Sequence, residues 1–145
     1  MIDELYNTAI LELAGGISHI GNLAAPQAVA SKTAKLCGSK ISVEISLNDN
    51  DIITEFAQSV KACAFGQAVA AILGKNIIGA KADEVIAAQE NLWDMLRHKT
   101  PMPKGRFDEL QKLAKIADLP QRHSSAALAF DAVKDAIEIA RSKAR

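Results

Sequence analysis

Two cysteines and one histidine are the residues of this chain with the most distinctive chemistry. Cys63 falls between a strand-like segment, residues 52–60, and an alanine-rich helix-like segment, residues 64–74, so we expect it at a helix N-terminus. Unpaired N–H groups and the helix dipole favour an anion there, and the thiolate is the form that binds metal or attacks sulfur. The alternative is a buried structural cysteine, because free cysteines are among the most buried residues.

Cys37 is brought toward Cys63 by the predicted hairpin between them. Apolar side chains alternate from Ile41 to Leu47, residues 48–51 are turn formers, and residues 52–57 are again rich in β-formers. Cys37 precedes the first strand and Cys63 follows the second, so antiparallel pairing places both thiols at one end of the hairpin. Gly38 predicts a bulge or a close backbone approach beside Cys37.

His123 lies just before the last predicted helix. Pro120 interrupts the preceding segment, and Ser124 or Ser125 is expected as the N-cap of that helix. His123 is then also near a helix N-terminus, although a histidine in a loop is more often exposed and inert. The same inert interpretation applies more strongly to His19 and His98, which have no candidate co-ligand nearby.

The other elements complete an α+β pattern. A first amphipathic helix spans residues 2–13, a long one residues 82–98, and a short one residues 107–116 after a proline-containing loop. We therefore expect one domain, residues 1–145, with a small antiparallel sheet of about three strands and helices packed on one of its faces.

Composition excludes several classes of protein. Seventeen basic and seventeen acidic residues cancel, and there is no basic stripe with interleaved aromatics, so nucleic acid is not an expected partner. The acidic start is unlike a signal peptide, and no apolar run approaches the ~20 residues of a membrane span. We expect a cytoplasmic protein without a membrane partner, whose cysteines are thiols rather than a disulfide.

Three features, in this order along the chain, resemble the IscU/SufU/NifU family of iron–sulfur cluster assembly scaffolds. They are Cys37-Gly38-Ser39 before a strand, Ala62-Cys63-Ala64 before an alanine-rich helix, and His123, three residues after Pro120, before the last helix. The segment from Lys99 to Ala117 looks like the insertion that distinguishes SufU-type members.

The resemblance implies a ligand set. Cys37 and Cys63 match the first two ligand cysteines of the family, and His123 matches the histidine that precedes the third. Ser39 stands where the family has aspartate and Ser124 where it has the third cysteine, so the chain resembles a divergent SufU-like member. Neutral serine is a poor ligand for iron or zinc, which makes these two the weaker candidates.

The function implied by the resemblance is that of a scaffold or sulfur-accepting protein rather than an enzyme. It would hold an iron–sulfur cluster or iron, with zinc as an alternative, and work with a cysteine desulfurase and apo iron–sulfur acceptor proteins as a monomer or weak homodimer. Two alternatives remain open: a degenerate docking protein that binds no metal, and a zinc-dependent sulfurtransferase.

Overall fold

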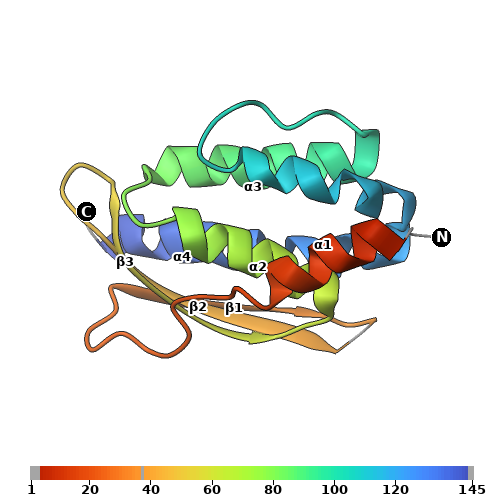
Figure 1. Cartoon of the computed structure of the whole chain (residues 1–145). Coiled ribbons are helices and arrows are strands. Elements are labelled where there is room, and N and C mark those ends of the chain that lie inside the picture. Colours follow the sequence, from red (N-terminus) through yellow and green to blue (C-terminus); the bar gives the residue numbers. More distant parts are fainter. Residues whose placement is uncertain (1–3, 37, 144–145) are drawn as a thin grey trace.

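The computed structural model, which describes residues 4–36 and 38–143, is an α+β fold with a three-stranded antiparallel sheet in the order β1-β2-β3 (Figure 1). Its elements are α1 (Glu4–Ala14), β1 (Ala28–Ala34), β2 (Ser39–Leu47), β3 (Ile53–Lys61), α2 (Ala64–Asn76), α3 (Ala82–His98), the 3₁₀ segments η1 (Asp108–Asp118) and η2 (Pro120–Arg122), and α4 (His123–Lys143). The predicted fold class is confirmed.

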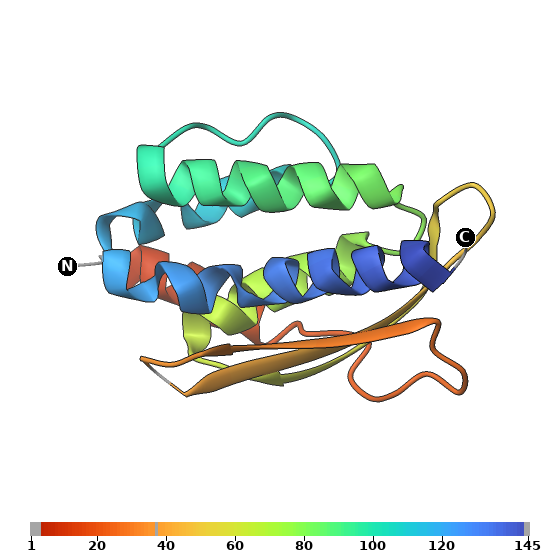
Figure 2. The same cartoon turned by 180° about the vertical axis from the view of Figure 1, so that it is seen from behind.

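The elements form layers on one side of the sheet. In Figures 1 and 2 the sheet lies at the bottom, α2 and α4 lie over it, and α3 with η1 covers those two helices. Ile41, Val43 and Ile45 of β2 are fully buried beneath α4. Burying a large aliphatic side chain contributes roughly 1.5–3 kcal/mol, so the alternation in β2 fixes which face of the sheet meets the helices. No helix in the described part of the chain is long and apolar enough to span a membrane.

The β2–β3 hairpin agrees with the sequence prediction, whereas β1 has no clear periodic signal. Lys40 pairs with Lys61 at the end of the hairpin nearest Cys63. The buried positions of β1 are Ala28 and Ala34, because α4 packs closely on this strand. Alanine carries little of the apolar contrast that reveals a strand in a sequence.

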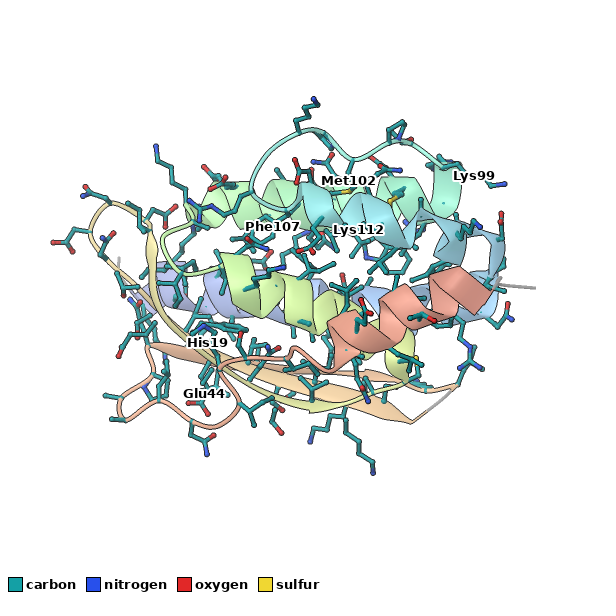
Figure 3. All side chains as sticks on the ribbon, viewed as in Figure 1. His19, Glu44, Lys99, Met102, Phe107 and Lys112 are labelled. Atoms are coloured by element: carbon teal, nitrogen blue, oxygen red, sulfur yellow. The ribbon has the colours of Figure 1, made fainter. Side chains whose placement is uncertain are left out.

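The segment between α1 and β1 covers the outer edge of β3. Ile20 bridges to Gln58, whose buried side chain donates to the carbonyl oxygens of Ser18 and Ala70 at 3.0 and 3.2 Å. The Leu23 N–H donates to Glu44 Oε1 at 2.9 Å, and Figure 3 shows His19 and Glu44 on this side of the molecule. The Gln58 backbone at this edge is paired as well: its N–H donates to the His19 carbonyl at 2.9 Å, and its carbonyl accepts from the Gly21 N–H at 3.1 Å, so these edge groups are not left open.

The residues after α3 form the cover of the helical layer. Lys99 adopts a left-handed conformation that ends α3, and Phe107 packs edge-to-face on Phe130 of α4 with ring centroids 5.4 Å apart. Figure 3 shows Met102 and Phe107 on this cover. The short helix predicted for residues 107–116 is present as η1, a 3₁₀ segment kinked at Leu113.

The start of α4 differs from the prediction. His123 is already helical, with φ −59° and ψ −49°, so Ser124 and Ser125 are inside the helix and the prediction of either as N-cap is wrong. Pro120 begins the turn η2, which runs directly into α4. Proline favours the first position of a helical turn, and it starts the helical path earlier than the two serines indicate.

Candidate functional site

Cys63 is the N-cap residue of α2, as its position in the sequence predicts. Its backbone is extended, with φ −68° and ψ 171°, and its carbonyl accepts the first helical bond from the Gln67 N–H at 2.9 Å. The thiol is free and half-buried and makes no capping bond. The sulfur is thus partly accessible at the N-terminal end of α2, where the sequence places it.

Ser125 connects Cys63 to the sheet. Its Oγ lies 3.2 Å from the Cys63 sulfur and 3.3 Å from Ser39 Oγ. Ser125 is 2% exposed and Ser39 3% exposed. Three segments therefore converge on one spot: the start of β2, the start of α2 and the first turn of α4.

Gly66 permits this convergence. A Cβ at Gly66 would lie 2.9 Å from the Cβ of Ala62 and 3.0 Å from the Ser125 carbonyl oxygen. Both distances are shorter than van der Waals contact, so any larger residue would push α4 away from α2. Because Gly66 has no side chain, the Ser125 backbone can pack against the first turn of α2.

Cys37 lies outside the described residues, so the predicted proximity of the two thiols stays a prediction. Its neighbour Gly38 has φ +69° and donates its N–H to the Ala34 carbonyl at 2.9 Å, which closes the turn between β1 and β2. A Cβ on Gly38 would meet nothing within 4 Å. The predicted bulge or close approach is wrong: this glycine serves a left-handed turn.

His123 and Ser124 occupy different environments. His123 Nε2 lies 3.1 and 3.2 Å from the carbonyl oxygens of Ile116 and Ala117 at the end of η1. Because carbonyls only accept, Nε2 carries the hydrogen in these two contacts, and Nδ1 is the other ring nitrogen. Ser124 is exposed and lines a cavity of about 310 Å³ together with Ser125, Leu36 and neighbouring residues.

No group of three His, Cys, Asp or Glu side chains within residues 4–36 and 38–143 is arranged to hold a metal ion. Cys37, the other predicted thiol ligand, is not among these residues. His19 packs edge-to-face on Phe56, and His98 is the last residue of α3. Neither position gives a reason to revise the expectation that these two histidines are inert.

Ser125 is a candidate site residue that the sequence analysis does not identify, because its position before the last helix predicts only a helix cap. A signal was present: Ser125 is on the same helical stripe as Ala129, Ala132 and Ala136, all of them fully buried. A serine in line with an apolar stripe is expected to face the interior, where its hydroxyl needs a partner.

Comparison with known proteins shows the family. The sequence model of the NifU-like N-terminal domain family matches residues 5–144, so the chain belongs to this family. The chain is 26% identical over 137 residues to the iron-sulfur cluster assembly scaffold protein IscU of Streptococcus pyogenes serotype M1, an alignment that covers 94% of this chain and 85% of that protein. The resemblance inferred from the motifs is confirmed at the level of the family.

Two solved structures share the fold. One is a nitrogen-fixing NifU-like protein (N-terminal) from Brucella abortus, 44% identical, with 97% of each chain covered and a TM-score of 0.92. The other is a putative iron-sulfur cluster assembly scaffold protein for the SUF system from Fervidobacterium islandicum, with a TM-score of 0.80. At 17% identity over 94% of this chain and 96% of that one, the second comparison supports the fold alone.

Proposed function

We propose that this protein is an iron–sulfur cluster assembly scaffold that holds a nascent cluster, or the iron for it, through Cys37, Cys63 and His123. Membership of the NifU-like family supports the function, and the curated relative is named as such a scaffold. The observation that carries the proposal is Cys63 itself: a free, half-buried thiol at the N-terminus of α2, where the starts of β2 and α4 also meet.

The proposed donor atoms, two thiolate sulfurs and one imidazole nitrogen, suit a metal ion or cluster that is bound and then passed on. Thiolate and imidazole are suitable ligands for iron, zinc and iron–sulfur clusters. Three protein donors leave one position of a four-coordinate metal open, and incomplete ligation favours release over permanent storage. The hydrogen bond from His123 Nε2 to backbone carbonyls supports its proposed part, since metal-binding histidines commonly donate their other N–H in this way.

The proposed partners follow from the cargo. A cysteine desulfurase supplies sulfur as a persulfide, and apo iron–sulfur proteins receive the finished cluster. Where Cys63 accepts sulfur directly, its thiolate attacks the terminal sulfur of the desulfurase persulfide, the sulfur–sulfur bond breaks, and the desulfurase cysteine leaves as thiolate. That step needs no external oxidant or reductant. The protein itself then acts as carrier rather than enzyme.

Metal analysis with an absorbance spectrum, on protein purified without chelator, tests the proposal. Iron with visible absorbance supports the scaffold, zinc alone supports a zinc-dependent sulfurtransferase, and no metal supports a docking protein. His123→Ala should reduce the bound metal, whereas the matched control His98→Ala, at the exposed end of α3, should leave it unchanged. Equal metal content in both variants would remove His123 from the ligand set.

A further inference from the structure

The hydroxyl of Ser125 is buried between the Cys63 sulfur and the Ser39 hydroxyl. When Cys63 is a thiolate, the direction of both hydrogen bonds is fixed. A serine hydroxyl has one hydrogen to donate and two lone pairs to accept with. A thiolate, whether free or bound to metal, offers only lone pairs. Against a Cys63 thiolate, Ser125 is therefore the donor across the 3.2 Å contact, and its oxygen is free to accept from Ser39 across 3.3 Å.

Ser125 is held in place by the backbone of two helices. It lies in the first turn of α4, it is 2% exposed, and its carbonyl is close to the position that a side chain of Gly66 would occupy. Little of Ser125 is exposed to solvent, and its hydroxyl lies between the Cys63 sulfur and the Ser39 hydroxyl. Its neighbour Ser124 is exposed, so the two adjacent serines differ in the property that matters here.

We propose that Ser125 is a positioning residue for the cargo, one that fixes the Cys63 sulfur and donates a hydrogen bond to it while the metal or cluster is bound. This inference rests on the proposed scaffold function. Hydrogen bonds to ligand sulfurs help to set the electronic properties of iron–sulfur sites, and loss of an outer partner typically costs 10–100-fold in metal affinity. Ser125 thus acts on the cargo through Cys63.

The hydrogen bond has a spectroscopic consequence. It stabilises the sulfur lone pairs, so more energy is needed to move an electron from sulfur to the metal. Removing the bond should therefore shift the thiolate-to-metal charge-transfer band to lower energy. A purely structural part for Ser125 in packing α4 would not produce that shift.

Anaerobic titration with cobalt(II), a coloured substitute for zinc and iron, tests the proposal on the full chain. We expect Ser125→Ala to shift the thiolate-to-cobalt band to lower energy and to weaken cobalt binding about tenfold. Ser142→Ala, an exposed serine near the other end of α4, is the matched control and should leave band and affinity unchanged. Circular dichroism of each variant checks that the fold is retained.

The outcomes separate the two proposals. Wild-type protein that takes up no cobalt in a thiolate site overturns the scaffold function and, with it, the part of Ser125. A wild-type band that is identical in Ser125→Ala overturns the part of Ser125 alone. Should Ser125→Ala fail to fold, Ser39→Ala decides: the inference requires a smaller shift in the same direction, and an unshifted band contradicts it.

Discussion

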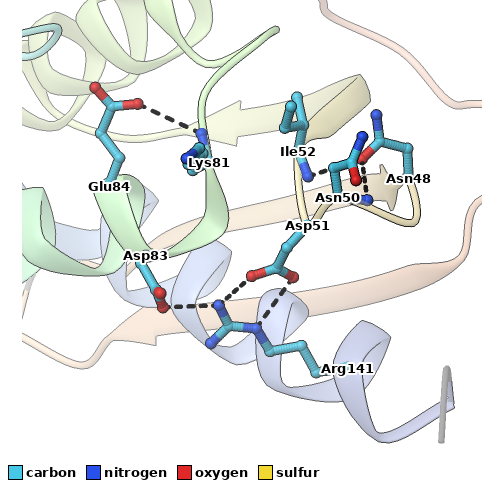
Figure 4. Close-up of polar contacts among 8 residues, drawn as sticks. All are labelled: Asn48, Asn50, Asp51, Ile52, Lys81, Asp83, Glu84 and Arg141. Carbon is cyan, nitrogen blue, oxygen red and sulfur yellow. Dashed lines mark hydrogen bonds and ion pairs between the residues drawn. The ribbon is translucent and has the colours of Figure 1, made fainter.

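The two ends of α4 show two different uses of polar groups. At its C-terminal end, Arg141 binds Asp51 of the β2–β3 turn and Asp83 at the start of α3, with Nε 3.3 Å from Asp51 and Nη2 2.7 Å from Asp83 (Figure 4). The hydrogen bond to Asp51, and to a smaller extent the one to Asp83, raises the pKa of Arg141 above its ordinary value. At its N-terminal end, Ser125 contacts a thiol and a second hydroxyl.

The contacts of Arg141 are structural, whereas those of Ser125 belong to the candidate functional site around Cys63. The Arg141 cluster joins three elements by opposite charges, and Asn48 reinforces the turn by accepting the N–H groups of Asn50 and Ile52 (Figure 4). The contact of Cys63 is with the small, neutral hydroxyl of Ser125, and its sulfur is half-buried. Sixteen residues, about 24 Å of helix, separate Ser125 from Arg141, so variants at one should not affect the other.

Cys63→Ala should produce the largest effect and confine it to metal binding. Losing a ligand should cost more than the 10–100-fold typical of an outer partner, so we expect at least about a 100-fold loss in zinc or cobalt affinity. Competition titration against a chelator measures it. Because Cys63 makes no capping bond, metal-free stability should change little. An affinity equal to wild type would show that Cys63 is not a ligand.

Gly66→Ala should damage both the fold and the site. The added methyl overlaps Ala62 and the Ser125 carbonyl, and such overpacking costs about 1–3 kcal/mol of unfolding free energy, measured by urea denaturation. Gly15→Ala is the matched control, because a Cβ there meets carbonyl oxygens only at 3.5 and 3.6 Å. Equal stability of the two variants would mean that the close approach of α2 and α4 is not enforced by Gly66.

Arg141→Met should lower stability without touching the metal. It leaves Asp51 and Asp83 without their cation, and we expect a loss of about 1–2 kcal/mol that shrinks at high salt. Arg141→Lys should fall between the variant and wild type, since lysine keeps the charge but not the two-pronged geometry. A change in cobalt affinity in either variant would refute the independence of the two ends.

Glu109 offers the smallest effect, and it depends on pH. Burial raises the pKa of Glu109, but hydrogen bonds from Lys75 and Lys112 outweigh it and leave the pKa below its ordinary value. A lowered folded-state pKa contributes stability above the unfolded pKa, and that contribution is lost as pH falls through the folded pKa. Glu109→Gln should thus be less stable than wild type by at most about 1 kcal/mol near neutral pH, and equally stable in strong acid. A difference independent of pH would contradict this.

The sequence predicts the elements that have strong apolar contrast and misses those that depend on close packing. Ile41, Val43 and Ile45 reveal the central strand, whereas the alanines of β1 do not. Pro120 and the two serines indicate a helix start, but the continuous path from η2 into α4 is a tertiary outcome.

The candidate site likewise has one feature that the sequence predicts and one that it does not. Cys63 at a helix N-terminus is local information and is confirmed. The contact between Cys63 and Ser125 spans 62 positions in the chain and depends on the close approach that Gly66 permits. Spacing in a sequence carries no information about such an approach. The part of Cys37 in the ligand set stays a prediction.

Cluster transfer to an acceptor protein tests whether the protein is a scaffold that holds its cluster through Cys63. The protein would be incubated anaerobically with ferrous iron, cysteine, a cysteine desulfurase and a thiol reductant that converts persulfide sulfur to sulfide. It would then be freed of small molecules and mixed with an apo-ferredoxin while circular dichroism in the visible range follows the cluster. We expect wild type to form a cluster and pass it on, and Cys63→Ala to do neither. A wild type that forms no cluster under these conditions, or a Cys63→Ala variant that transfers as well as wild type, would contradict this expectation.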